Sequence, residues 1–320
     1  MYSMKPIPIA IIAVALIAVA GIGAALILTD DGDDDRDTIT VTMSWEKDIA
    51  QQIAGDNYRI ISMMESNVSP HEAYSTPSNV SDLYKSKIYF KIGSGVEWET
   101  AFMDTVSKDI PSSVKVVDIA SSIEYTPLPN THHHHHEGAD HEEGDHEEHD
   151  HEESANDAHI WTSPDILRKV AALMADKIAE IDPGNASEYA ANLDRYNAKV
   201  DKVDAKMQTV AELVGNGHTH VVVWHPAWQY LLGQYAEMFG ADFHQISVEE
   251  DGEVSPAEAA KIVKDENCKA IYVSTTDEGY EGRKALEEAG ITVHVVAPTA
   301  TDMLASVTEF LGFLESDLKA

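Results

Sequence analysis

The apolar positions of the chain fall into two alternating patterns, short runs and longer stretches with helical spacing. Short apolar runs predict strands at residues 38–43, 58–63, 88–92, 116–119, 220–224, 243–248, 270–274 and 292–296. Helical stretches separate them, and such alternation is typical of parallel sheets covered on both faces. We therefore predict an α/β fold of two lobes, each a parallel sheet flanked by helices.

One helix stands out between the two sets of strands. A helix beginning at Ser163-Pro164 is followed, after Pro183-Gly184, by an uninterrupted pattern over residues 186–214 that stops at Gly215-Asn216-Gly217. Its apolar residues recur at alternating steps of four and three, on a rod about 43 Å long: Tyr189, Leu193, Tyr196, Val200, Val203, Met207, Val210 and Val214. A coiled-coil partner is one interpretation. Strand–helix patterns on both sides favour a helix that links the two lobes.

These patterns divide the 320 residues into five parts. Residues 1–29 form an apolar membrane anchor or signal segment, and residues 30–37 an acidic linker. The N-terminal lobe spans residues 38–184, the linking helix 185–217 and the C-terminal lobe 218–320.

The N-terminal segment is long enough to cross a bilayer. Residues 6–28 contain no charge, and 23 helical residues span about 30 Å. Lys5 precedes them and five aspartates follow within residues 30–35, which predicts that everything after residue 29 is exported. A cleaved signal peptide usually has a shorter apolar core, so we favour an uncleaved anchor at the outer face of the cytoplasmic membrane.

Charge and cysteine content exclude several partners and kinds of site. A net charge of −34 makes nucleic acid an unsuitable partner, because phosphate binding needs a basic face. The single cysteine, Cys268, excludes an internal disulfide, a thiolate zinc site and a lipid anchor near the N-terminus.

Residues 131–154 interrupt the N-terminal lobe with nine histidines, ten acidic residues and no large apolar residue. Such a segment buries too little surface to order itself, so we predict a loop. Many imidazoles on a loop predict weak metal binding, which would fade below about pH 6. The histidines are His132, His133, His134, His135, His136, His141, His146, His149 and His151.

Three of the seven other histidines follow strands or precede helices. They are His71, His159 and His225. In open parallel sheets, ligands bind at the edge where each strand leads into the following helix. Three imidazoles with one carboxylate make a tetrahedral zinc site. His218 and His220 lie one strand length from His225, at the opposite edge, and His244 and His294 lie inside strands. We do not expect these four to be ligands of that site.

At these residues the chain resembles the solute-binding proteins of metal-ion ABC transporters, the zinc/manganese cluster. The matching motifs are PHEAYSTPS around His71, HIW at His159, HPAW at His225, and an aspartate late in the second lobe, Asp302. The chain departs from the family at Ser69, Ser75 and Ala158, where the family commonly has Asp, Glu and Pro.

The resemblance implies a receptor, monomeric and not an enzyme, that delivers its metal to an ABC permease with a cytoplasmic ATPase. It implies His71, His159, His225 and Asp302 as ligands, with Glu278 or water as alternatives to Asp302. Manganese-type members tend to have Glu in place of His225, so the histidine and the His-rich loop imply Zn²⁺.

Other functions stay open at this point. A receptor for Mn²⁺ or another divalent metal, a metal buffer and an adhesin would share the same fold. A zinc hydrolase fits less well, because the chain lacks a His-Glu-x-x-His motif.

Overall fold

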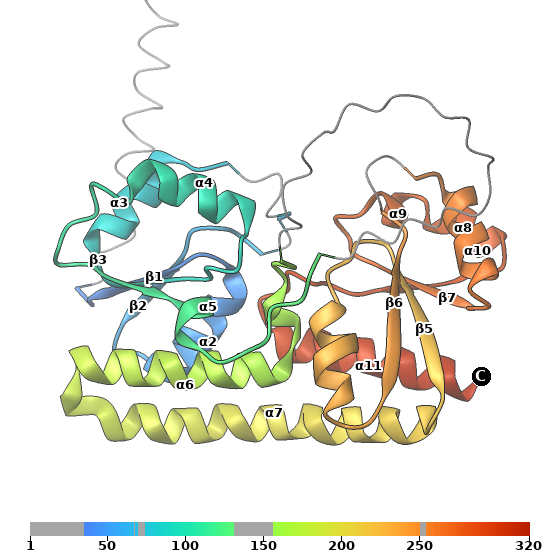
Figure 1. Cartoon of the computed structure of the whole chain (residues 1–320). Coiled ribbons are helices and arrows are strands. Elements are labelled where there is room, and N and C mark those ends of the chain that lie inside the picture. The colour runs from blue at the N-terminus through green and yellow to red at the C-terminus, as the bar shows by residue number, and fades with distance from the viewer. Residues whose placement is uncertain (1–34, 67, 70–73, 131–155, 250–253) are drawn as a thin grey trace, which may run out of the picture. The chain divides into compact units, whose positions relative to one another are not determined.

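The fold is built on two four-stranded parallel sheets (Figure 1). The first has the order β2-β1-β3-β4, and the second the order β6-β5-β7-β8. The strands of the first sheet are β1 (Thr38–Val41), β2 (Arg59–Ser62), β3 (Ser86–Lys91) and β4 (Lys115–Asp118). Those of the second are β5 (His218–Val223), β6 (Asp242–Ser247), β7 (Ala270–Val273) and β8 (Thr292–Val295).

Helices follow the strands as the alternation predicts. In the first lobe they are α2 (Ser44–Ala54), α3 (Pro77–Lys85), α4 (Glu97–Val106) and α5 (Ile119–Ser122). In the second they are the π-helical segment η3 (Leu231–Tyr235), α8 (Pro256–Asp265), α9 (Glu278–Glu281) and α10 (Arg283–Glu288). The predicted α/β class is confirmed, and strand ends differ from the predicted ones by one or two residues, the usual spread for element boundaries.

This computed structural model describes residues 35–66, 68–69, 74–130, 156–249 and 254–320. The predicted anchor at residues 6–28, His71 and the His-rich loop therefore lie outside the described residues. Within those ranges no helix combines the length and apolar character that a membrane span needs. Residues from Asp37 to Ala320 form one compact unit.

The linking helix matches its prediction. Five elements connect or support the lobes: η1 (Ile160–Thr162), α6 (Pro164–Ile181), η2 (Pro183–Asn185), α7 (Ala186–Val214) and α11 (Met303–Lys319). Helix α7 packs against α2 and α6 of the first lobe and against the C-terminal helix α11 (Figure 1). Its predicted apolar seam is buried, with Leu193 and Val214 only partly so. The seam thus serves packing within the chain.

Ser/Thr-Pro pairs begin three of the helices. Thr76 and Ser255 cap α3 and α8 through their hydroxyls, with proline in the first turn. Ser163 occupies the same position before α6 but makes no side-chain cap hydrogen bond. The helix start predicted at Ser163-Pro164 is therefore confirmed, although it is the one of the three that makes no side-chain cap.

The two lobes share a core. One cluster of buried apolar residues runs from both sides of the first sheet through α6 and α7 to Trp228, Tyr272 and α11. Trp161 stacks on Trp45 and donates a hydrogen bond from Nε1 to the carbonyl of Pro298, at 2.6 Å. This shared core joins the lobe that carries His159 to the lobe that carries His225.

Candidate metal centre

His159 is positioned by the segment that leads into α6. Its side chain is buried, and Nδ1 lies 2.8 Å from Oδ1 of Asp157. The same oxygen accepts the backbone N–H of His159 at 2.9 Å. Asp157 is itself only 3 % exposed, so the carboxylate fixes both the ring and the backbone. An Nδ1–H that donates to a carboxylate leaves Nε2 as a lone-pair donor toward a metal.

The backbone on either side of the His-rich loop is tied down beside His159. Pro129 and Asn156 form an antiparallel bridge, and the hydroxyl of Tyr230 donates to the carbonyl of Asp157 at 3.2 Å. Ser94 donates its hydroxyl to the carbonyl of Ala158 at 2.6 Å. The residue that departs from the family's proline is thus held by a hydrogen bond from the turn after β3.

His225 comes from the other lobe. It lies two residues beyond β5, and its Nδ1 is 2.8 Å from Oε2 of Glu249, which lies two residues beyond the neighbouring strand β6. The His225 side chain is 24 % exposed, more accessible than His159. The arrangement repeats that of His159, with a carboxylate on Nδ1 and Nε2 directed elsewhere.

The two imidazoles meet at their Nε2 atoms. These atoms lie 3.3 Å apart, and the rings stand edge to face with planes 79° apart. Two nitrogen ligands of a tetrahedral Zn²⁺, each about 2.0–2.1 Å from the metal, are about 3.3–3.4 Å apart. The pair therefore already has the separation of two ligands on one zinc ion.

Asp277 is a carboxylate whose charge interacts with that of His225. It follows β7, the strand on the other side of β5, and its Oδ2 accepts the backbone N–H of Ser274 at 2.6 Å. Burial raises the pKa of Asp277 to about 6, and the negative charge of Glu249 adds to the rise. The Ser274 N–H and the charge of His225 act in the opposite direction. A positive ion bound at His225 would favour the ionised carboxylate in the same way.

The other predicted ligands are placed as follows. The Oδ1 atom of Asp302 accepts the N–H of Ala305 at 2.9 Å and caps α11. Burial raises the pKa of Asp48 on α2 and of Tyr196 on α7, and the charge of Asp302 adds to both rises. His71, the side chain of Glu278 and the loop histidines lie outside what the structure describes.

Of the predicted set, the structure thus brings together His159 and His225. Over the described ranges, no three His, Cys, Asp or Glu side chains already stand close enough to hold a metal ion.

The excluded histidines lie elsewhere. His218 and His220 are in the first half of β5, whereas His225 lies beyond its end. His294 stacks on Phe313 and bonds to Asp317 at 2.9 Å, which is a packing role.

Three carboxylates of this region were absent from the sequence prediction: Asp157, Glu249 and Asp277. Glu249 and Asp277 stand just past the end of a strand, the criterion that selected His225. Applied to carboxylates as well as histidines, that criterion would have found both. Asp157 had a signal too, because it lies two residues before a candidate ligand.

Metal-binding proteins are among the known proteins that this chain resembles. A manganese-binding lipoprotein, MntA of Halalkalibacterium halodurans, is 24 % identical over 236 residues, which cover 72 % of this chain and 68 % of MntA.

Two solved structures share the fold. A ZnuA deletion mutant with zinc bound has a TM-score of 0.68 at 22 % identity, and the match covers 89 % of this chain and 99 % of that one. A Mn-bound periplasmic metal-binding protein of Candidatus Liberibacter asiaticus has a TM-score of 0.65 at 18 % identity, with coverage of 87 % and 100 %.

The decisive match is to a whole family. Residues 39–320 match the family described as the zinc-uptake complex component A, periplasmic, abbreviated ZnuA. That range includes both sheets, the linking helix and the paired histidines. The chain therefore belongs to the ZnuA family of extracytoplasmic metal-binding proteins.

Proposed function

We propose that this protein captures Zn²⁺ outside the cytoplasm and delivers it to an ABC-type permease driven by a cytoplasmic ATPase. The observation that carries the proposal is the contact between His159 and His225, whose Nε2 atoms are 3.3 Å apart. Each lobe supplies one imidazole, and each imidazole has its Nδ1 on a carboxylate. This is the usual outer arrangement of histidine ligands to zinc.

Zinc is favoured over manganese by the donor type. Imidazole suits Zn²⁺, whereas Mn²⁺ prefers carboxylate and water oxygens. His225 stands where manganese-type members of the family tend to have Glu. The relatives include both a manganese-binding lipoprotein and a zinc-bound ZnuA variant, so similarity alone leaves the metal open.

The proposed ligands are His71, His159 and His225, completed by a fourth group. We favour Asp277 over Asp302 as that group. The charges of Asp277 and His225 act on one another, whereas Asp302 already caps α11 and acts on Asp48. Glu278 and a water molecule remain the alternatives.

Release to a permease would then involve a small change in the relation of the lobes. The shared core and the bond from Trp161 to Pro298 resist a wide opening. A slight tilt of the lobes would move His159 away from His225, so that the two imidazoles no longer bind one metal ion, while the packing of α7 is kept.

The remaining parts of the proposal rest on sequence. Residues 6–28 would tether the receptor to the membrane, and residues 30–37 would hold it off the surface. The His-rich loop would gather zinc weakly and pass it to the site between the lobes.

Metal counting on the purified protein tests the proposal. We expect one tight zinc site per chain, held in competition against a large excess of Mn²⁺. Tighter binding of Mn²⁺ than of Zn²⁺ would reverse the metal assignment. The absence of any tight site would overturn the receptor role.

A further inference from the structure

Three histidines gather at the amino ends of two neighbouring strands of the second sheet. His218 and His220 are two residues apart on β5, and His244 of β6 pairs directly with His220. Residues two apart on a strand point to the same side, and directly paired residues of parallel strands share that side. All three imidazoles therefore lie on one face of the sheet, and Asp242, which pairs with His218, lies on it too.

The same face is apolar farther along the strands. Val222 of β5 and Trp224 just past its end are buried with residues of α8 and α10, as are Ile246 of β6 and Val248 just past its end. Along the two strands, the residues on this face therefore change from histidine to large apolar side chains where the helices cover the sheet. The three histidines lie where this apolar layer under α8 and α10 ends. The side chain of His218 is 49 % exposed and that of His220 34 %, so apolar packing does not account for them.

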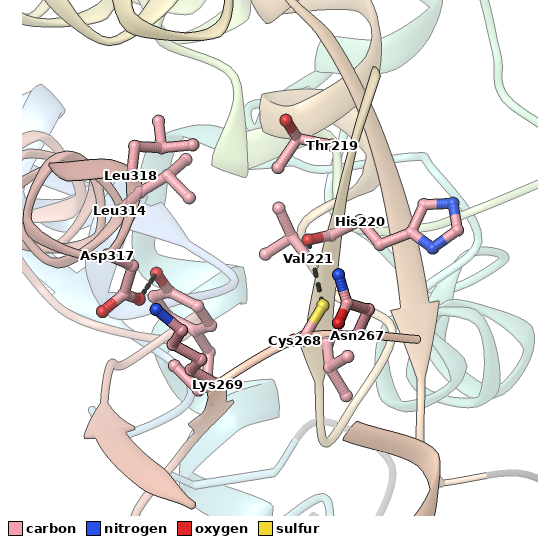
Figure 2. A pocket seen from close by; sticks show the side chains of 12 residues that line it. Thr219, His220, Val221, Asn267, Cys268, Lys269, Leu314, Asp317 and Leu318 are labelled. Atoms are coloured by element: carbon pink, nitrogen blue, oxygen red, sulfur yellow. Dashed lines mark hydrogen bonds between the residues drawn. The ribbon is translucent and has the colours of Figure 1, made fainter. Parts of the chain in front are cut away.

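The other face of β5 is different in character. Thr219 and Val221 line a cavity of about 180 Å³ together with Cys268 and Asp317. Figure 2 shows the His220 imidazole pointing away from that cavity, on the side opposite to Thr219 and Val221. His220 is thus one of the residues that line the cavity, but its imidazole lies on the other side of β5.

The ring spacings match those of a three-histidine metal site. The ring centroids are 5.0 Å apart for His218 and His220, 5.5 Å for His220 and His244, and 5.9 Å for His218 and His244. A zinc ion with Zn–N bonds of about 2.0–2.1 Å and tetrahedral angles places its imidazole centroids roughly 5.2 Å apart. The ring centroids thus already have nearly the required separation. As the rings stand, no three side chains of the described residues form a metal-binding group, so binding requires the imidazoles to rotate until three nitrogens face one point.

Two carboxylates stand where they would orient these rings. Nδ1 of His218 lies 3.0 Å from Asp242, and Nδ1 of His220 lies 2.6 Å from Glu266. A neutral imidazole that donates Nδ1–H to a carboxylate presents Nε2 as a ligand, and the carboxylate raises the basicity of that nitrogen. Glu266 also terminates α8, and the negative end of a helix dipole favours a cation nearby.

We propose that His218, His220 and His244 form a second metal site, for Zn²⁺ or a similar imidazole-preferring ion, at the end of the C-terminal lobe opposite to His225. Its affinity is at least ~100-fold lower than that of the His225 site, because the rings must be ordered on binding. The site is independent of the receptor role and shares no ligand with the first.

Equilibrium dialysis of the full chain against buffered free zinc tests this site. The His218→Ala/His220→Ala variant and the single His244→Gln variant each lose one weakly bound zinc per chain and keep the tight one. His225→Ala loses the tight zinc and keeps the weak one. The loop histidines are present in every variant and cancel in the comparison.

Thr219→Ala provides the matched control, because Thr219 lies between the two β5 histidines on the opposite face. Its zinc count equals that of the unaltered protein. With Co²⁺ as the probe, the His225→Ala protein shows a tetrahedral absorption band that adding His220→Ala removes. An unchanged zinc count in both histidine variants, each with an unaltered urea midpoint, overturns the proposal.

Discussion

The Nε2 atom of His159 lies 3.3 Å from the Nε2 atom of His225, although 66 residues separate them in the chain. Asp157 and Glu249 each take an Nδ1–H, so two lone pairs face each other unless a proton or a metal ion lies between them. Metal binding at this pair competes with protonation for the same lone pairs. The contact therefore favours a cation bound between the two nitrogens.

Removal of the His225 imidazole should abolish tight zinc binding. His225→Ala leaves His159 without its partner in the opposite lobe, and we expect the dissociation constant for zinc to rise by roughly 1000-fold, about 4 kcal/mol. Competition with a fluorescent zinc chelator measures the change. The fold should be unaffected, because the ring is partly exposed, and circular dichroism checks it. Retention of tight binding would show that the site lies elsewhere.

Loss of the carboxylate behind His225 should have a smaller effect. Glu249→Gln keeps the size of the side chain but removes the charge that orients Nδ1–H, 2.8 Å away. Outer partners of this kind typically contribute about 10- to 100-fold to metal affinity. The same chelator assay should give a value between those of the unaltered protein and His225→Ala. Equality with either extreme would contradict the orienting role.

Two aspartate variants decide between candidates for the fourth ligand. Asp277→Asn should weaken zinc binding at least tenfold if Asp277 completes the site. Asp302→Asn should change it less than threefold, because asparagine also caps helices and the α11 start is preserved. The opposite ranking would restore Asp302 as the ligand. A small effect from both would leave Glu278 or a water molecule in the fourth position.

The stability of the metal-free protein should depend on Asp48. Burial and the charge of Asp302 raise the pKa of Asp48 from 3.8 to about 6. The native state therefore holds this proton more tightly than the unfolded chain does. The charged carboxylate destabilises the fold in full above pH 6, and this cost disappears as the pH falls toward 3.8.

Asp48→Asn should thus increase the free energy of unfolding at pH 7.5 by about 1 kcal/mol, a value reduced for partial exposure to solvent. The gain should be close to zero at pH 4. Urea unfolding in the presence of a chelator measures both, and the exposed Asp194→Asn serves as control. Because Asp302 contributes to the shift, Asp302→Asn should reduce the gain. A gain that grows on acidification would contradict the assignment.

Much of the fold could be predicted from sequence because its signals are local. The 29 residues of α7 combine an unbroken seam with glycines at the end, so both ends were found. His225 was selected because it follows a strand end and His159 because it precedes a helix, the positions where ligands bind in open parallel sheets.

The carboxylates were harder to predict. The chain has 56 acidic residues, and acidic residues in folded proteins are mostly exposed. Asp302 lies at a helix start, and sequence alone does not tell whether its oxygens cap that helix or reach a metal. Asp277 follows a strand, as many acidic residues do, and its burial and its interaction with the charge of His225 are properties of the assembled fold.

Deletion of the His-rich loop should leave the tight site intact. Removing residues 132–153 leaves four residues, 130, 131, 154 and 155, between Pro129 and Asn156, which already form an antiparallel bridge. Four-residue connections are common in hairpins, so the deletion should not strain the segment that carries His159. A ZnuA deletion mutant that shares this fold has been crystallised with zinc.

We expect zinc titration by calorimetry to retain one tight site and to lose the weaker ones that the loop supplies. Replacing the nine loop histidines by serine at unchanged length is the control, since it removes the ligands without shortening the chain. If the deletion abolished tight binding but the serine variant did not, the loop's connection would position His159. If both abolished it, loop histidines would belong to the tight site, and the ligand assignment would have to be revised.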